Sequence, residues 1–199
     1  MAERPRNGAA DANERQRLFV GVPLPAKLLG FVEKAQAALP RSNELRFMRP
    51  DQLHVTLAFI GEVDAAKTSA ACAVVDSLSA DGGRAAEITG FLMLPSARKA
   101  RVVALDLDDR AQVFARLFET VMGGLEAAGV MTREKRPFRP HLTIARLRIP
   151  GPVQPRYESG RASYAIESVC LYRSELSREG ARYSVVARAV FGEKSGWKV

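Results

Sequence analysis

Both histidines of this 199-residue chain lie in the same four-residue pattern: histidine, an apolar residue, threonine and a second apolar residue. Residues 54–57 read HVTL, and residues 141–144 read HLTI. Successive side chains of a β-strand point to opposite faces, so this pattern places histidine and threonine on one face and the apolar pair on the other. Each copy therefore predicts a half-buried strand with an outward polar pair, and the duplication indicates that the two strands share one role.

Two histidines that face each other can divide a proton-transfer reaction, because imidazole titrates near neutral pH and can serve as base on one side and as acid on the other. Thr56 and Thr143 add hydroxyls about 6 to 7 Å further along each strand, on the same face. Such a pocket suits a phosphate. The chain has no Gly-x-Ser-x-Gly motif and no reactive-cysteine context for acyl transfer, and no cluster of metal ligands. We therefore predict phosphodiester chemistry that needs no metal and no cofactor.

The hydrophobic periodicity predicts strands and helices that alternate along the chain. Besides the two motif strands, strands are expected over residues 17–23, 46–48, 85–94, 101–107, 162–172 and 182–191. Helices are expected over 25–40, after a cap at Asp64 up to residue 78, and after a cap at Asp108 or Asp109 up to Gly129. Hairpins outnumber crossovers in this order, which is typical of an α+β fold with an antiparallel sheet. The wide separation of the two motif copies predicts two similar halves.

The two ends of the chain differ in composition from the rest. Residues 1–16 are polar and without periodicity, which predicts a disordered N-terminal tail, and residues 192–199 are expected to be a frayed C-terminal tail. Residues 17–191 are long enough to bury a core, given the 47% apolar content of the chain. We therefore expect a single domain there, composed of two small lobes.

The chain is basic, with a formal net charge of +8 and a sequence pI near 9.9. This favours an anionic partner such as RNA, although solubility alone explains the charge equally well. Cys72 and Cys170 stand alone in the sequence and are typical of buried residues in a reduced cytosolic protein. No apolar run approaches the roughly 20 residues that span a bilayer, and the N-terminus lacks the apolar segment of a signal peptide. We expect a cytoplasmic protein without a membrane partner.

From residue 17 onward the chain resembles the 2H phosphoesterases, and within them the RNA 2',3'-cyclic phosphodiesterases, formerly called 2'-5' RNA ligases. The similarity is carried by RLFVGVPLP at 17–25, RPDQLHVTLAFIGEV at 49–63, FRPHLTIAR at 138–146, LYRSEL at 171–176 and GARY at 180–183. Residues 51–52 read DQ where the family more often has EN, and the N-terminal tail has no counterpart. The resemblance implies two lobes related by a pseudo-twofold axis, each a small antiparallel sheet backed by helices. The histidine strands would line a central cleft.

The resemblance also implies the reaction, the opening of a 2',3'-cyclic phosphate at an RNA end to leave a 2'-phosphate. His54 would be the proton donor to the departing 3'-oxygen, and His141 the proton acceptor for the attacking water. The symmetry of the two motifs leaves this assignment open. Thr56, Thr143 and nearby arginines would hold the non-bridging phosphate oxygens, where charge builds in the transition state.

Four residues outside the motifs are candidates for substrate binding: Arg139, Phe47, Tyr183 and Arg136. Arg139 shares a strand face with the second histidine. Arg136 belongs to a basic loop over residues 132–138, although charged runs are more often solvated faces. Phe47 is placed to stack on a base, but core packing is the more frequent role of such a residue. Tyr183 matches a family position near the cleft, and half-buried packing in the sheet explains it equally well.

Other functions share these features. The reverse reaction would join RNA halves through a 2'-5' linkage, and a small cyclic phosphate such as ADP-ribose 1'',2''-cyclic phosphate would suit the same chemistry. A nucleotide- or RNA-binding module that has lost turnover is a third possibility, and the intact histidine and threonine pairs argue against it. We expect a monomer with no obligate protein partner, acting on RNA or an oligonucleotide with a cyclic phosphate end.

Overall fold

The computed structural model describes residues 15–79, 85–133, 137–177 and 180–191. The strands in these residues form one nine-stranded sheet with antiparallel pairing, in the order β7-β4-β5-β6-β3-β1-β8-β9, and β2 pairs with β6 beside this path. The strands are β1 (Gln16–Pro23), β2 (Leu45–Phe47), β3 (His54–Val63), β4 (Ala85–Leu94), β5 (Ala100–Asp108), β6 (His141–Gly151), β7 (Ala162–Ala165), β8 (Ser168–Ser177) and β9 (Gly180–Val190).

The α-helices are α1 (Leu29–Ala37), α2 (Ala65–Asp76) and α3 (Val113–Ala127), and the short 3-10 helices are η1 (Ala26–Leu28), η2 (Pro50–Gln52) and η3 (Ala97–Lys99). The expected cap at Asp64 is confirmed, because its carboxylate accepts a hydrogen bond from Lys67 N at the start of α2. The N-cap residue of α3 is Gln112 rather than Asp108 or Asp109, although the Asp109 carboxylate accepts from Val113 N and Ala115 N in the first turn. Both carboxylates satisfy backbone donors that lack a partner within the helix.

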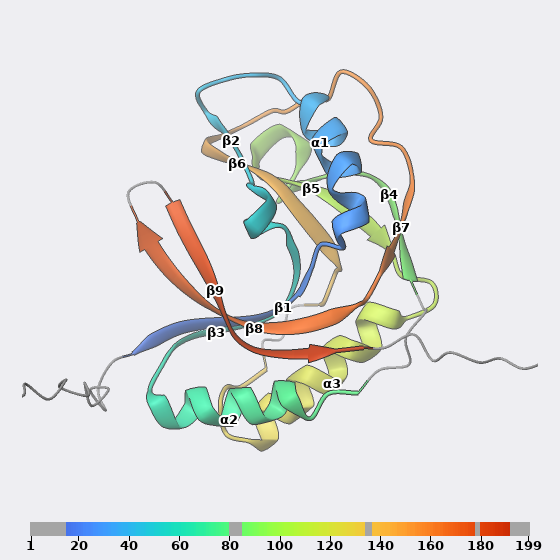
Figure 1. Ribbon diagram of the computed structural model, residues 1–199. Coiled ribbons are helices and arrows are strands. Elements are labelled where there is room, and N and C mark those ends of the chain that lie inside the picture. Colours follow the sequence, from blue (N-terminus) through green and yellow to red (C-terminus); the bar gives the residue numbers. More distant parts are fainter. Residues whose placement is uncertain (1–14, 80–84, 134–136, 178–179, 192–199) are drawn as a thin grey trace, which may run out of the picture.

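The two motif strands, β3 and β6, meet at the middle of the sheet and divide it into two lobes (Figure 1). The first lobe contains β3, β1, β8 and β9, and the second contains β6, β5, β4 and β7, with β2 on β6. Only one residue pair joins β3 to β6 directly, Val55 opposite Leu142. The order of strands is therefore symmetric about the motif pair, and the expected α+β fold with an antiparallel sheet is confirmed.

Two of the three described α-helices, α1 and α3, connect the lobes (Figure 1). Helix α1 follows β1 of the first lobe but packs against β6 of the second, where Gln36 Nε2 donates to Met48 O and Ile144 O at 2.8 and 3.0 Å. Helix α3 follows β5 of the second lobe and bridges the two lobes, because it packs against β3 and α2 of the first and against β4 of its own. One continuous set of buried apolar side chains runs through both lobes.

One expected strand is divided in two. Residues 162–172 were expected to form a single strand, but β7 ends at Ala165 and β8 begins at Ser168. Strand β7 pairs with β4 in the second lobe, whereas β8 pairs with β1 and β9 in the first, so the chain crosses between lobes at residues 166–167. The expected tails over 1–16 and 192–199 lie outside the described residues except for Arg15 and Gln16, and Gln16 already belongs to β1. None of the described helices is long and apolar enough to cross a membrane.

Candidate active site

Each histidine is the first residue of its motif strand. Because β3 and β6 run antiparallel with Val55 opposite Leu142, the register brings His54 beside Thr143 and Thr56 beside His141. Residues directly opposite each other in antiparallel strands point to the same face, so the four polar side chains converge there. The predicted outward pairs of the two motifs are therefore brought together by the fold.

The two imidazole rings are held in the same way. The Nδ1 atom of His54 lies 2.8 Å from the carbonyl oxygen of Gln52, and the Nδ1 atom of His141 lies 2.8 Å from the carbonyl oxygen of Arg139. A carbonyl oxygen only accepts, so each Nδ1 carries the hydrogen and donates it. Nε2 of each ring is thereby left to accept a proton when the ring is neutral and to donate one when it is charged.

Further contacts fix the two segments that supply these carbonyls. The buried side chain of Gln52 donates from Nε2 to Ala181 O on β9 at 2.6 Å and accepts from Arg49 N at 3.1 Å. Arg139 makes a two-pronged pair with Asp106 on β5, with distances of 3.1 and 2.7 Å from Nε and Nη2 to the carboxylate oxygens. Each histidine is thus anchored through another strand of its own lobe, the edge strand β9 for His54 and the adjacent strand β5 for His141, which limits the freedom of the ring.

A cavity of about 370 Å³ opens beside His141. Its polar wall carries Thr56, Thr143, His141, Arg139 and Arg146, and its apolar wall carries Leu57, Ala58, Phe59, Leu94, Val102, Phe118, Met122, Met131, Pro137 and Phe138. Phe118 and Phe138 stack on each other with ring centres 4.3 Å apart. A site lined by cations and hydroxyls together with aromatic and thioether groups can hold a phosphate next to a flat apolar group.

Two β-bulges bring two residues into this cavity that the sequence pattern did not predict. Leu57 is an extra residue of β3 without a partner on β1. Ile144, at the matching position of the second motif, is an extra residue of β6 without a partner on β5. A bulge reverses the alternation beyond it, so Phe59 and Arg146 turn to the face of the histidines. Phe59 is 61% exposed although it lies in a strand.

His54 and His141 differ in their surroundings. Burial lowers the pKa of His54 to about 4, the positive charges of Arg146 and His141 act in the same direction, and the bond to the Gln52 carbonyl opposes them. His141 instead lines the open cavity. In the free protein at neutral pH, His54 is therefore neutral and its Nε2 is a hydrogen-bond acceptor.

The residues predicted to bind substrate have different positions in the structure. Arg139 lines the cavity, but its guanidinium is already paired with Asp106, which raises the pKa of Arg139 further. Tyr183 packs edge-on against the His54 ring. Phe47 lies on β2 opposite Ala145 and packs against the main core, away from the residues that line the cavity. Arg136 lies outside the described residues.

Arg133, in the basic loop before β6, is already paired with carboxylates. Arg133 donates to the Glu119 carboxylate at 2.7 Å, lies 3.8 Å from the Glu126 carboxylate, and stands over the Phe118 ring at 5.6 Å. These contacts tie Arg133 to α3, where it supports one wall of the cavity. Lys135, like Arg136, lies outside the described residues.

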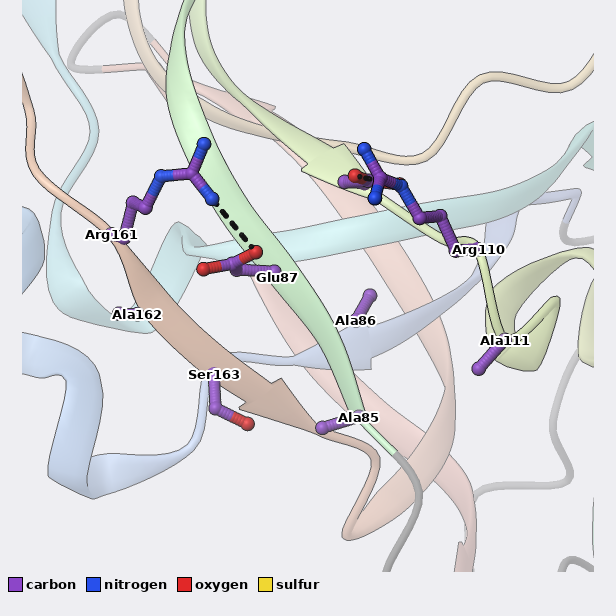
Figure 2. Close-up of a pocket in the computed structure, with 9 residues that line it drawn as sticks. Ala85, Ala86, Glu87, Arg110, Ala111, Arg161, Ala162 and Ser163 are labelled. Atoms are coloured by element: carbon purple, nitrogen blue, oxygen red, sulfur yellow. Dashed lines mark hydrogen bonds and ion pairs between the residues drawn. The ribbon is translucent and has the colours of Figure 1, made fainter.

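A second, larger cavity of about 570 Å³ lies in the second lobe, where β4, β7 and the end of β5 meet (Figure 2). Its two cations are both paired with carboxylates, Arg161 with Glu87 at 3.1 Å and Arg110 with Asp108 at 2.9 Å. A phosphate would have to displace these carboxylates, and neither histidine lines this cavity. The cavity beside His141 is therefore the candidate active site. No group of three or more histidine, cysteine or carboxylate side chains within the described ranges could hold a metal ion.

Known proteins resemble this chain in sequence. The family model described as LigT like Phosphoesterase matches residues 22–104. The chain is 30% identical over 184 residues to the RNA 2',3'-cyclic phosphodiesterase of Escherichia coli (strain K12), and the match covers 88% of this chain and 97% of that relative. It is also 30% identical to the protein of the same name from Thermus thermophilus, with 86% of this chain and 88% of the relative covered.

Solved structures agree in fold. The crystal structure of TT0787 from Thermus thermophilus matches with a TM-score of 0.73 and 27% identity, covering 87% of this chain and 97% of that one. The crystal structure of E. coli LigT complexed with 3'-AMP matches with a TM-score of 0.71 and 28% identity, covering 89% and 99%. The fold, the paired motifs and these relatives lead to one conclusion: the chain belongs to the LigT-like phosphoesterase family, together with the RNA 2',3'-cyclic phosphodiesterases.

Proposed function

We propose that this chain hydrolyses the 2',3'-cyclic phosphate at an RNA end to a 2'-phosphate, using its two histidines and no metal ion. The observation that carries the proposal is the matched anchoring of the two rings. Each Nδ1 donates to a backbone carbonyl two residues earlier, which leaves two Nε2 atoms for proton transfer on one face. The names of the relatives point to the same reaction.

The reaction needs one proton removed and one proton supplied. In our proposal His141 accepts a proton from water as the water oxygen attacks phosphorus. The bond from phosphorus to the 3'-oxygen breaks, and His54 donates its proton to that oxygen. The phosphate stays on the 2'-oxygen, and the histidines regain their starting forms by exchange with solvent. Each transfer contributes on the order of 10² to 10⁴ in rate.

Charge on the phosphate grows in the transition state and needs donors fixed in advance. Thr56, Thr143 and Arg146 line the cavity and supply two hydroxyls and a guanidinium on the face of the histidines. Arg139 contributes positive charge that Asp106 partly offsets. The apolar wall with Phe59 suits a nucleobase by stacking, because every base has an aromatic face. Both histidines come from one chain, so we propose that a monomer suffices and that RNA is its partner.

Because the pKa of His54 is low, its ring must take up a proton before it can act as a donor. A ring with a pKa of about 4 is largely neutral at pH 7 in the free enzyme. An anionic phosphate next to Nε2 favours the charged ring, so substrate binding raises the pKa of His54. The ring then takes up a proton from solvent. In the opposite assignment His54 would be the proton acceptor, a role that its neutral ring in the free enzyme can fill directly.

The position of the phosphate in the product tests the proposed roles of the two histidines. Nucleoside 2',3'-cyclic monophosphates are incubated with the enzyme in the presence of EDTA, and the product is identified by chromatography against 2'- and 3'-monophosphate standards. We expect the 2'-monophosphate, at a rate that EDTA does not change. A 3'-monophosphate would contradict the proposed roles. A reaction that requires added divalent metal would overturn the mechanism, and binding without any product would favour the binding module.

A further inference from the structure

The two histidines share their anchoring but not their neighbours. Three aromatic rings surround His54: the ring centres of Phe19, Tyr183 and Tyr172 lie 4.7, 5.4 and 5.8 Å from that of the imidazole. Of the ring contacts among the described residues, none involves His141. The pseudo-symmetry of the two motifs is therefore broken at the side chains next to the reacting groups.

The register of the sheet identifies the cause. Phe19 on β1 is opposite Phe59, the fifth residue after His54, and Val102 on β5 is opposite Arg146, the fifth residue after His141. Phe19 and Val102 thus occupy matching positions in the two lobes. The Phe19 ring covers His54, whereas the smaller Val102 leaves the space that becomes the cavity beside His141.

The rings around His54 form a cluster of their own. Phe19, Cys170 and Tyr172 are buried together apart from the main core, with Tyr183 packed against them. Phe19 stacks on Tyr172 with ring centres 4.9 Å apart and meets Tyr183 edge-on at 5.0 Å. Space is also limited at Gly21, where an added Cβ would lie 3.2 Å from Cδ2 of His54. The imidazole is therefore held by close contacts from three strands.

We propose that Phe19, Tyr172 and Tyr183 form an aromatic box that positions the His54 ring, excludes water from it, and so makes two otherwise equivalent histidines chemically different. The predicted effect of the box on turnover rests on the proposed function, whereas its predicted effect on the protonation of His54 does not. The three residues act through His54 and are positioning residues. Tyr183 is the most accessible of them, because it lies on the edge strand β9 and is only partly buried.

The charged and polar groups that face His54 from the other elements are few. Arg146 and His141 approach from β6, the Gln52 carbonyl comes from η2, and the two tyrosines come from β8 and β9. With water excluded, the charge of Arg146 is poorly screened, and the neutral His54 ring is favoured until an anion arrives. The box therefore couples uptake of a proton at His54 to binding of a phosphate.

Nuclear magnetic resonance tests this directly, because the chain has only two histidines. The ¹⁵N shifts of the imidazoles are followed from pH 4 to 8 in the free protein, and a His141→Gln variant assigns the His54 signals. In the wild type we expect a His54 midpoint below about 5. In Tyr183→Ala the midpoint should rise by about one pH unit because water reaches the ring. Adding inorganic phosphate should raise it in the wild type.

Two matched variants serve as controls. Tyr183→Phe keeps the ring without the hydroxyl, and Val185→Ala removes an exposed side chain from the same strand. Both should titrate as the wild type does, and far-UV circular dichroism should show that all three variants are folded. An unchanged His54 midpoint in Tyr183→Ala would overturn the box. So would a Tyr183→Phe midpoint that moves as far as that of Tyr183→Ala.

Kinetics separates the box from a contact with substrate. If Tyr183 acts through His54, Tyr183→Ala should shift the pH profile of kcat/KM, and Tyr183→Phe should restore it. A residue that only touches substrate would raise KM alike at every pH, which would contradict the inference. The titration needs no turnover, so a protein with the expected midpoints but no phosphodiesterase activity would refute the proposed function and leave the box standing.

Discussion

At the scale of single residues, the two histidines should be indispensable for turnover and dispensable for folding. We expect His54→Ala and His141→Ala each to lower kcat by at least about a hundredfold, because each removes one of two proton transfers. His141 lines an open cavity, whereas His54 packs against three aromatic rings, so we expect both variants to fold and His54→Ala to be the less stable of the two. Single-turnover assays with 2',3'-cyclic AMP and circular dichroism measure the two effects. Near-wild-type turnover in either variant would contradict the mechanism.

The pKa of His54 also predicts an acid sensitivity of the fold. The unfolded ring binds a proton below about pH 6.5, while the folded ring stays neutral down to about pH 4. The free energy of unfolding should therefore fall as the pH drops from about 6.5 to about 4, by at most about 3 kcal/mol, and this contribution should level off below that window. Urea denaturation at several pH values measures it. In His54→Gln the decline over this window should be smaller, and an equal decline would assign it to other groups.

At the scale of elements, the bulge in β6 turns Arg146 to the face of the histidines, and distance along the strand decides which arginine lines the cavity. Arg146 lines the cavity, whereas Arg148, two residues further along β6, does not. We expect Arg146→Ala to weaken binding of adenosine 2'-monophosphate by about tenfold, as for the loss of one charge-assisted hydrogen bond, and Arg148→Ala to change it little. Isothermal titration calorimetry compares the two variants. Equal losses would mean that both residues act only through long-range charge.

Some features of the strands could be predicted from the sequence and others could not. Two-residue alternation predicted which face carries the histidines and threonines, because that property is local to each strand. It failed for Phe59 and Arg146, since the residues at each bulge are all apolar and nothing in their pattern signals an extra residue. It also joined β7 to β8, because residues 166–167 contain neither glycine nor proline and the break depends on pairing with two different lobes. The aromatic box around His54 is likewise assembled from three distant segments.

At the scale of the whole molecule, the net charge of +8 should govern binding of longer RNA. The affinity for an oligonucleotide should fall steeply with salt and that for a mononucleotide less so, because only the longer ligand releases several counterions. Fluorescence anisotropy at several salt concentrations measures both slopes. Arg133→Gln alone should leave the oligonucleotide slope unchanged, since Arg133 already pairs with Glu119 and Glu126. Neutralising Lys135 and Arg136 should flatten it, and an unchanged slope would assign both to a solvated loop.

The packing of two helices across the lobes bears on how the molecule can move and come apart. Helix α1 belongs by sequence to one lobe and packs against the other, and α3 packs against both lobes. A hinge that spread the lobes would have to pull both helices off their sheets, so the two proton-transfer groups keep their separation while substrates enter and leave. For the same reason neither lobe can melt first. Differential scanning calorimetry should show one transition with equal calorimetric and van't Hoff enthalpies, and two separable transitions would show that this packing does not couple the lobes.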